Sequence, residues 1–224
     1  PSGMHESPFG KGPVRLFRTR VGQAYNFQFH VSNKDKPLGH FLVFAPTGGG
    51  KSTLMLHLLS GLAKFPGVRS YLFDSKEGAR FMVEAMGGVY QPYEKLALNP
   101  LDVGADTVAN RNRVSAMLRL LAGEAAYEDG ASDILRHAFP RNTNLRRSLG
   151  LWVRDAKGNI GSHSHVFNAP DDSLSGVLDH FMVAINMNEA LEDPLLGPPV
   201  VSHIASAIGR TAGGGKGFAI FIDE

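Results

Sequence analysis

The chain has 224 residues, of which 43% are hydrophobic and 20% are charged, a composition typical of globular proteins that excludes a largely disordered chain. A net charge of +2 is too small to indicate nucleic acid binding by itself, and the absence of cysteine excludes disulfides and thiolate metal sites. No apolar run approaches the roughly 20 residues of a membrane-spanning helix, and no signal peptide is evident. These properties favour a soluble, cytoplasmic protein, with upstream sequence expected because the chain begins with Pro1.

The chain begins with a lead-in segment, residues 1–37, rich in Gly, Pro and basic residues. Its aromatic alternation over Tyr25–His30 predicts an edge strand. Residues 38–103 then show the pattern of the first half of an α/β core. The continuous apolar run Phe41–Phe44 predicts a strand buried on both faces.

A helix is predicted after this strand, because leucines recur at helical spacing from Leu54 to Leu62 until Phe65-Pro66-Gly67 ends the pattern. A second apolar strand covers Tyr71–Phe73, and a second helix is predicted over Glu77–Met86. This alternation of strands and helices indicates a parallel sheet with covering helices.

Residues 104–216 are predicted to be a mainly helical insertion into this core. Apolar residues trace one helical face from Val108 to Leu121, and another at Ile134, Leu135 and Ala138. A hairpin is predicted between Leu151 and Phe167, and a helix from Pro198-Pro199 to about Gly209. Residues 217–224 return to the core as an apolar strand, Phe218–Ile222.

The most informative motif is the glycine-rich run Ala45–Ser52, which lies between a predicted strand and a predicted helix. A phosphate-binding loop needs inward-pointing backbone N–H groups, and glycines allow the phosphate to approach them. The pattern G-x-x-x-x-G-K-[ST] is met except that Ala45 replaces the first glycine. Lys51 would reach the β- and γ-phosphates, and the Ser52 hydroxyl would bind Mg²⁺. The predicted nucleotide-binding residues are Pro46, Thr47, Gly48, Gly49, Gly50, Lys51, Ser52 and Thr53.

The last strand supplies the second half of this site, because it ends in two carboxylates, Asp223 and Glu224. Asp223 would hold Mg²⁺ and Glu224 would orient and deprotonate the attacking water. Taken alone, the strand would be read as a buried strand with solvated acids at its end. Together with the loop, it predicts an ATPase that uses ATP and Mg²⁺, with Glu224 and Lys51 as catalytic residues.

Four other features carry alternative interpretations. Asp74 ends a predicted strand and would either contact the nucleotide or cap a helix. His163 and His165 would share one face of a strand, but no third metal ligand is evident. The arginines between Arg111 and Arg154 would face DNA, a neighbouring subunit or solvent. Arg210 is a candidate arginine finger on charge alone.

The order of these motifs resembles the CagE/TrbE/VirB family, the ATPases of type IV secretion and conjugal transfer. The resemblance covers nearly the whole chain. The Asn-Pro element Leu98–Leu101 and the segment Leu151-Trp152-Val153 distinguish this family from the many other proteins that share the nucleotide-binding motifs. It implies a P-loop NTPase with a RecA-like parallel sheet and a mainly helical insertion, truncated after the Walker B strand. It also implies a homo-oligomer, suspected to be a hexamer, that binds secretion channel proteins at the cytoplasmic face of the bacterial inner membrane.

In RecA-like sheets of this class, the next strand lies between the Walker A and Walker B strands and would be encoded after Glu224. We therefore expect a gap in mid-sheet and poor ATP hydrolysis by these residues alone. The alternative functions are a DNA-pumping translocase of the coupling-protein type, although charge does not indicate DNA, and a regulatory nucleotide-binding fragment.

Overall fold

The protein is described here by a computed structural model that covers residues 2–3, 6–30, 39–123, 149–154, 157–212 and 217–223. The chain forms two compact units. The first contains Pro1–Tyr90, His180–Asn186 and Ala212–Glu224, and the second contains Gln91–Asp179 and Met187–Thr211. The chain therefore leaves the first unit and returns to it twice.

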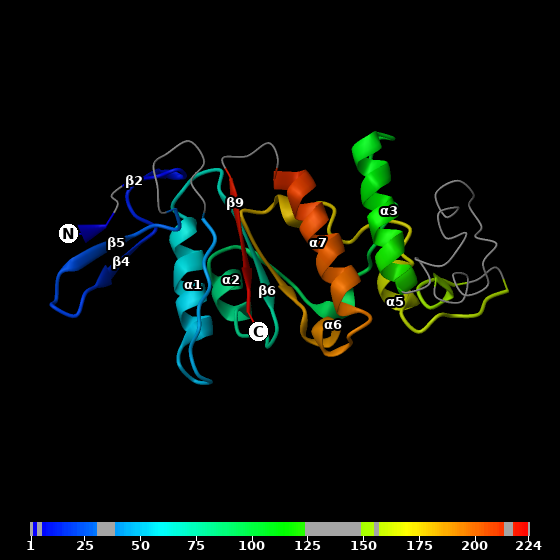
Figure 1. The fold of residues 1–224 in the computed structure, drawn as a ribbon, viewed down its shortest axis with the longest axis horizontal. Coiled ribbons are helices and arrows are strands. Elements are labelled where there is room, and N and C mark those ends of the chain that lie inside the picture. The colour runs from blue at the N-terminus through cyan, green and yellow to red at the C-terminus, as the bar shows by residue number, and fades with distance from the viewer. Residues whose placement is uncertain are drawn as a thin grey trace. The chain divides into compact units, whose positions relative to one another are not determined.

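The main sheet has the strand order β7-β8-β6-β9 (Figure 1). Strand β6, Arg69–Asp74, pairs in parallel with β8, Met182–Asn186, on one side and with β9, Phe218–Ile222, on the other. Strand β7, Val89–Gln91, completes the sheet beside β8. The described structure is thus mixed α/β with a parallel sheet, as predicted.

The predicted strands have different outcomes. The final strand is confirmed, because β9 covers the same residues as the apolar run, and Tyr71–Phe73 lies within β6. Strand β8 was not predicted, because its residues lie within the segment expected to be a helical insertion. All its residues are buried, and its apolar run Met-Val-Ala-Ile was the signal that could have revealed it.

The strand predicted at Phe41–Phe44 is wrong, since residues 39–46 form no strand. The side chains of Leu42 and Phe44 are 82% and 88% exposed instead of buried. A strand exists only when a neighbour supplies a row of backbone partners. Here a cavity separates the segment from β9, so no described strand offers its backbone to it.

Helix α1, Lys51–Leu62, confirms the helix predicted after the glycine-rich run. It buries Met55, Leu58, Leu59 and Leu62, whose spacing places them on one helical face. Helix α2, Arg80–Ala85, is shorter than the predicted range of Glu77–Met86.

The lead-in segment forms small sheets of its own. Strand β5, Ala24–Phe27, lies between β1, Ser2–Gly3, and β4, Arg15–Arg18. The edge strand predicted at Tyr25–His30 is therefore wrong in its position, because β5 is paired on both sides. Strands β2, Glu6–Ser7, and β3, Gly10–Lys11, form a separate antiparallel pair.

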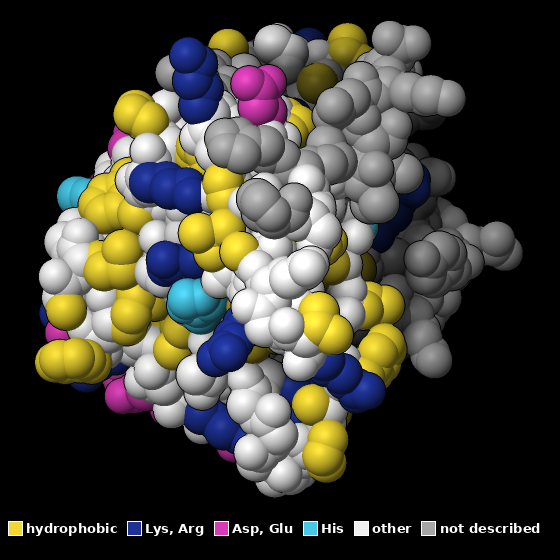
Figure 2. Space-filling model, turned by 90° about the vertical axis from the view of Figure 1, so that its left-hand side faces the viewer, with side chains coloured by type: hydrophobic (Ala, Val, Ile, Leu, Met, Phe, Trp, Pro, Cys, Tyr) yellow, Lys and Arg dark blue, Asp and Glu magenta, His cyan; other side chains and the backbone are white. Residues whose placement is uncertain are grey.

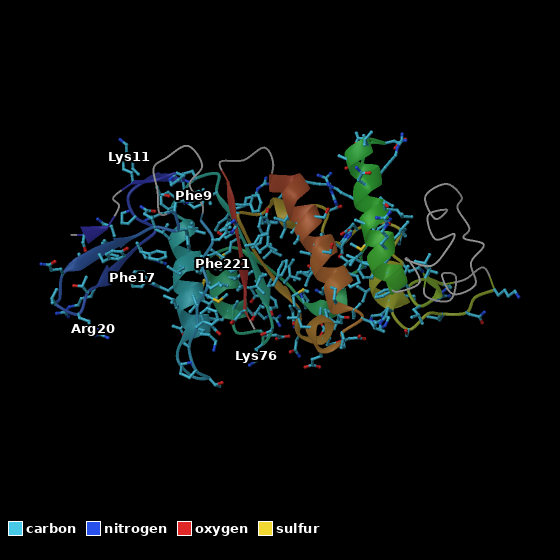
Figure 3. The ribbon with its side chains drawn as sticks, viewed as in Figure 1. Phe9, Lys11, Phe17, Arg20, Lys76 and Phe221 are labelled. Atoms are coloured by element: carbon cyan, nitrogen blue, oxygen red, sulfur yellow. The ribbon has the colours of Figure 1, made fainter. Side chains whose placement is uncertain are left out.

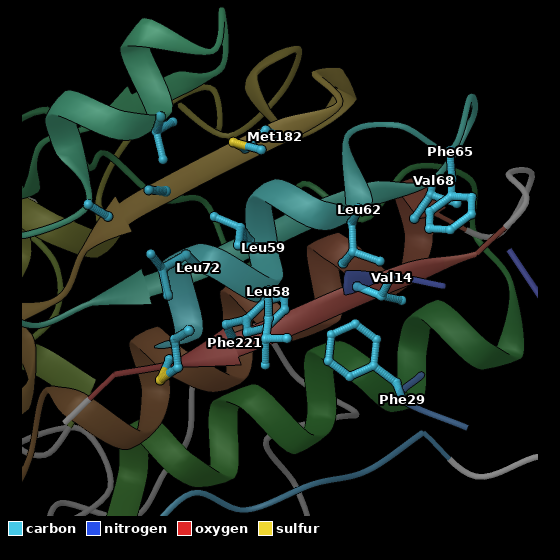
Figure 4. Close-up of a cluster of buried hydrophobic side chains, with 14 of the residues drawn as sticks. Val14, Phe29, Leu58, Leu59, Leu62, Phe65, Val68, Leu72, Met182 and Phe221 are labelled. Carbon is cyan, nitrogen blue, oxygen red and sulfur yellow. The ribbon is translucent and has the colours of Figure 1, made fainter. Parts of the chain in front are cut away.

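One hydrophobic cluster joins the lead-in segment, α1 and the main sheet (Figure 4). Val14 and Phe29 contribute from the lead-in segment, and Leu72 and Phe221 contribute from β6 and β9. Gly61 permits the close approach, because a Cβ there would lie 2.6 Å from the carbonyl oxygen of Val14. The lead-in segment is thus part of the core of the first unit.

The lead-in segment also presents an exposed face. Leu16 and Val21 are 62% and 81% exposed, and Arg18 and Arg20 beside them in sequence are also exposed. Figure 2 shows hydrophobic side chains intermixed with Lys and Arg side chains on this side of the molecule. Figure 3 shows Arg20 at the outer end of the hairpin formed by β4 and β5.

The described part of the second unit is mainly helical, and its bounds differ from those of the predicted insertion. Its longer helices are α3, Val108–Ala122, and α7, Gly197–Ala212. The Thr107 side chain caps α3 by accepting a hydrogen bond from the Asn110 N–H. The shorter helices are η1, Tyr93–Lys95; α5, Ser164–Phe167; η4, Val177–Asp179; and α6, Asn188–Glu192.

The hairpin predicted between Leu151 and Phe167 is mostly wrong. The described residues there form a single antiparallel bridge, Arg154 to Ile160, and Ser164–Phe167 is helical. The helical face predicted at Ile134, Leu135 and Ala138 lies outside the described residues. Among the described helices, none has the length and apolar character that crossing a membrane requires.

Candidate nucleotide site

The glycine-rich run folds as a tight loop whose shape depends on its glycines. Gly48 and Gly50 have positive φ angles of 76° and 85°, in the left-handed region that side chains disfavour. Gly49 has no room for a side chain, because a Cβ would lie 2.9 Å from the Pro46 carbonyl oxygen. The Gly49 N–H donates to this same oxygen, 2.9 Å away. Positive φ angles therefore explain Gly48 and Gly50, and a close backbone approach explains Gly49.

The loop leads directly into the N-terminus of α1, which starts at Lys51. Gly50 is the N-cap residue and has no side chain, so no side-chain cap occupies the first amide groups of the helix. The N–H groups of the first turn have no partner within a helix, and the helix dipole makes this end attractive to anions. A loop of this shape before a helix of this length has the features of an anion-binding site.

Lys51 is folded back over the loop. Its Nζ donates a hydrogen bond to the backbone carbonyl oxygen of Ala45, 2.8 Å away. The ammonium group is therefore held at the loop that precedes it along the chain. Ser52 and Thr53 follow in the first helical turn with exposed side chains, and Pro46 and Thr47 are exposed in the loop.

A cavity of about 1010 Å³ is lined by both Lys51 and Asp223. One side of this cavity is the segment Gly39–Ala45, and the other is Ile220–Asp223 at the end of β9. Because residues 39–46 form no strand and β9 is at an edge of the described sheet, this cavity lies beside the sheet and is not the mid-sheet gap that was expected. Ser52 is not in its wall, and Glu224 lies outside the described residues.

Asp223 is positioned by the main sheet. Its backbone N–H donates to the carbonyl oxygen of Phe73, 3.0 Å away, which continues the parallel pairing of β9 with β6. Asp223 therefore lies at the carboxyl end of the sheet, where ligands of open α/β sheets bind.

Protein ligands for a metal ion are few here. No group of three or more His, Cys, Asp or Glu side chains suited to a metal ion occurs among the described residues. The candidate ligands Ser52 and Asp223 offer oxygen atoms, which suit Mg²⁺. Because Mg²⁺ commonly takes one or two protein ligands and completes its shell with phosphate and water, this donor set fits it.

Asp74 is fully engaged within the protein. Its carboxylate accepts hydrogen bonds from the N–H of Ala79 at 3.0 Å, from the N–H of Lys76 at 3.4 Å and from the Tyr90 hydroxyl at 3.2 Å. It is 1% exposed. Of its two interpretations, the cap-like role in the turn before α2 is the one that this geometry supports. Burial and the Asp74 carboxylate raise the pKa of Tyr90 far above its ordinary value.

A polar cluster in the second unit was not predicted from the sequence. His203 of α7 pairs through Nε2 with the Asp172 carboxylate, and both residues are buried. The same carboxylate accepts hydrogen bonds from the backbone N–H groups of Leu174 at 2.9 Å and of Asn99 at 3.2 Å. Burial by itself would raise the pKa of Asp172, but the bonds from His203 and the two amides outweigh it and lower this pKa.

The Asn-Pro element and the tryptophan have structural roles in this unit. The Asn99 side chain donates to the Pro170 carbonyl oxygen at 2.8 Å, and the Trp152 indole donates to the Leu121 carbonyl oxygen at 2.8 Å.

No spacing in the sequence links Asp172 with His203, because they lie 31 residues apart. This buried acid–histidine pair is visible only in the folded chain.

The two histidines and the described arginines that the sequence singled out do not line the candidate nucleotide site. The metal interpretation of His163 and His165 is not supported: α5 replaces the strand, and His163 packs on Trp152 with its Nε2 3.8 Å from Asp193. Arg111 pairs with Asp106 at 2.6 Å on an exposed surface. Arg141, Arg146 and Arg147 lie outside the described residues.

Arg210 is half-buried in the last turn of α7 and donates to the Ser206 hydroxyl at 3.3 Å. Burial and the nearby Arg113 lower its pKa. With Asp102 and Asp172 it lines a cavity of about 240 Å³ in the second unit.

Comparison with known proteins identifies the fold. No protein-family model and no curated protein sequence matches the chain. The solved structure of VirB4 of Thermoanaerobacter pseudethanolicus is similar to this chain, with a TM-score of 0.55 and 14% sequence identity. The match covers 100% of this chain and 78% of that one.

The chain has a VirB4-like fold. This likeness confirms the α/β architecture expected from the motifs. At 14% identity, it is a statement about the fold alone.

Proposed function

We propose that this protein is an ATP-hydrolysing motor that energises a type IV secretion or conjugal transfer system. The observation that carries the proposal is that Lys51 and Asp223 line the same cavity, at the carboxyl end of a parallel sheet and beside an uncapped helix N-terminus. The VirB4-like fold supports the secretion role.

The loop residues would hold the nucleotide. Gly48 and Gly50 carry no side chains that would keep phosphate oxygens from the backbone of the loop, and the first turn of α1 adds its own free amides. Lys51 would exchange its bond with the Ala45 carbonyl oxygen for the β- and γ-phosphates. Its ammonium would then neutralise charge that builds up on the transferred phosphoryl group.

Ser52 and Asp223 would hold Mg²⁺, whose charge would assist the leaving phosphate. Ser52 would contribute its hydroxyl oxygen, which is exposed in the first turn of α1. Asp223 would contribute its carboxylate, directed by the pairing of its backbone with Phe73. Glu224, the next residue, would orient the attacking water and accept its proton.

The partners and location follow from the proposed motor role. We expect a homo-oligomer, with a hexamer as the first state to test, that binds secretion channel proteins at the cytoplasmic face of the bacterial inner membrane. A motor of this kind needs such partners because hydrolysis must be coupled to a moving load.

ATP hydrolysis by the full-length protein tests the proposal. The rate should depend on Mg²⁺, should fall at least about a hundredfold in Lys51→Ala and should not change with added DNA. Equal turnover of the wild type and Lys51→Ala would contradict the assignment of the site. Strong stimulation by DNA that weakens steeply with salt would instead favour the DNA-pumping translocase.

A further inference from the structure

The small net charge of the chain hides a strong separation of charge along it. Residues 7–73 contain nine Lys and Arg residues and a single acidic residue, Asp35, and therefore carry a net charge of +8. The rest of the chain carries −6, because the whole chain carries +2. The described segments 7–30 and 39–73 contain no Asp or Glu. Charge asymmetry of this kind indicates an anionic partner for the basic part of a chain, which is either a membrane surface or a nucleic acid.

The hairpin formed by β4 and β5 is a fixed frame within this basic segment. Arg15 of β4 donates hydrogen bonds to the His57 carbonyl oxygen at 2.7 Å and to the Ser60 hydroxyl, both in α1. Phe17, two residues further along β4, packs edge-on against the His57 ring. One face of the hairpin is therefore attached to α1, and the other face is held in place by this attachment.

The outer face of the hairpin is basic and apolar. Because side chains alternate between the two faces of a strand, Leu16 and Arg18 lie on the face opposite to Phe17. The Leu16 side chain is 62% exposed, and Arg18 is also exposed. The turn between the strands adds exposed Arg20 and Val21, and the Val21 side chain is 81% exposed. Two arginines and two aliphatic side chains thus share one exposed surface.

The turn that carries Val21 is held by its own hydrogen bonds. The Thr19 hydroxyl oxygen accepts from the Gln23 N–H at 3.0 Å, and the Thr19 carbonyl oxygen accepts from the Gly22 N–H at 2.9 Å. Gly22 has a φ angle of 83°, a conformation that glycine adopts readily and that lets the chain reverse here. Because this backbone is already ordered, a partner that binds Val21 does not have to order it.

The aliphatic side chains on this surface distinguish between the two classes of anionic partner. Figure 2 shows hydrophobic side chains among Lys and Arg side chains on this side of the first unit, and Figure 3 shows Lys11 and Arg20 on the same side. A nucleic acid binds arginine through its phosphates but its bases stack on aromatic side chains. A bilayer offers anionic headgroups and, directly beneath them, acyl chains that accept aliphatic side chains. Leu16 and Val21 therefore favour a membrane surface.

We propose that the outer face of the β4–β5 hairpin docks on an anionic lipid bilayer. Arg18 and Arg20 bind the lipid phosphates, and Val21 enters the boundary between headgroups and acyl chains with Leu16 beside it. Arginine suits this position because its apolar stem can lie along acyl chains while its guanidinium stays at the headgroups. The proposal goes beyond the proposed function, since it names a lipid partner and rests on charge and exposure instead of on the nucleotide site.

Co-sedimentation of the full-length protein with lipid vesicles tests this proposal. One set of vesicles contains phosphatidylcholine alone, and the other contains equal parts of phosphatidylcholine and the anionic lipid phosphatidylglycerol. The double variant Arg18→Gln/Arg20→Gln removes two positive charges from the hairpin. The matched control, Lys95→Gln/Arg119→Gln, removes the same charge from exposed positions of the second unit. A third variant, Val21→Ser, removes the aliphatic side chain from the turn.

The wild type should bind the anionic vesicles and should not bind the neutral ones. In Arg18→Gln/Arg20→Gln, the lipid concentration for half-maximal binding should rise at least about tenfold, because the charges that meet the headgroups are gone. In Val21→Ser, it should rise at least about threefold, because less apolar surface enters the bilayer. The control should stay within about twofold of the wild type, and all melting temperatures should agree because every substituted side chain is exposed.

The proposal is wrong if the wild type does not bind the anionic vesicles, or if the hairpin variant and the control bind them equally well. Unchanged binding by Val21→Ser would contradict the entry of the turn into the bilayer. If the wild type binds a single-stranded oligonucleotide instead of vesicles, and Arg18→Gln/Arg20→Gln abolishes this binding, the surface serves a nucleic acid and the lipid proposal fails.

The docking surface and the nucleotide site can fail separately. ATP turnover without vesicles should be the same in the wild type and in all three variants, because none of the substituted residues lines the candidate nucleotide site. A wild type that binds anionic vesicles through the hairpin but does not hydrolyse ATP would contradict the proposed function alone. A wild type that hydrolyses ATP but does not bind these vesicles would contradict the docking surface alone.

Discussion

Lys51 Nζ lies 2.8 Å from the backbone carbonyl oxygen of Ala45, so the lysine that follows the glycine-rich loop bonds back to the residue that opens it. This bond holds the ammonium group at the loop without any ligand. The loop and the helix N-terminus thus form a compact, positively polarised unit. Several variants test whether this unit is built for phosphate.

Replacing Gly49 by alanine should disrupt the loop. The added Cβ would lie 2.9 Å from the Pro46 carbonyl oxygen and 3.0 Å from the Ala45 Cβ, so the backbone must shift. We expect affinity for ATP to fall at least tenfold, or about 1.4 kcal/mol, measured by equilibrium binding. Gly209→Ala is the control, because a Cβ there meets open space within α7 and should leave affinity unchanged.

Replacing Asp172 by asparagine should destabilise the second unit by about 3 kcal/mol, because it breaks a buried pair and leaves His203 without its charged partner. Trp152 is the single tryptophan of the chain and is buried in this unit, so its fluorescence reports urea unfolding there. The exposed Asp106→Ala is the control and should leave the transition unchanged.

The lowered pKa of Asp172 predicts that the unfolding free energy depends on pH in the acid range. Because the folded state lowers the pKa of Asp172, its stabilisation is complete above the unfolded pKa of about 3.9 and is lost as the pH falls through the folded pKa. Unfolding free energy measured by tryptophan fluorescence should therefore drop below about pH 4 in the wild type. An equally steep drop in Asp172→Asn would assign the dependence to other groups.

The raised pKa of Tyr90 predicts that the stability of the first unit depends on pH in the alkaline range. Burial and Asp74 raise its pKa, so its stabilisation is complete below the unfolded pKa of about 10 and is lost as the pH rises through the folded value. Tyr90→Phe should destabilise this unit by about 1.5 kcal/mol at neutral pH, because Asp74 loses a hydrogen bond. It should also weaken the loss of stability above pH 10, which circular dichroism can follow. An unchanged alkaline transition in Tyr90→Phe would contradict this account.

Local patterns in the sequence were enough to predict much of the fold. The apolar run at Phe218–Ile222 became β9, and the leucines of α1 lie on one buried face. These predictions succeeded because hydrophobic periodicity is a local property. The same local evidence predicted a strand at Phe41–Phe44, whose existence depends on a neighbour that the described chain does not place there.

Features made by distant residues could not be predicted. The pairing of Asp172 with His203 and the contact of Asn186 with Glu77 each join segments far apart in the chain. The positive φ of Glu77 has no sign in the sequence, because glutamate rarely adopts it. Such contacts depend on topology, and β8 itself was hidden within a segment of predicted helices.

The most direct test of the nucleotide site is the equilibrium binding of ATP in the presence of Mg²⁺, measured by calorimetry. The wild type and Lys11→Ala should bind with the same affinity, since Lys11 is exposed on β3 and lies away from the loop (Figure 3). Lys51→Ala should bind at least about tenfold more weakly, because the ammonium that meets the phosphates is gone. Equal binding by all three proteins, or no binding by the wild type, would contradict the account.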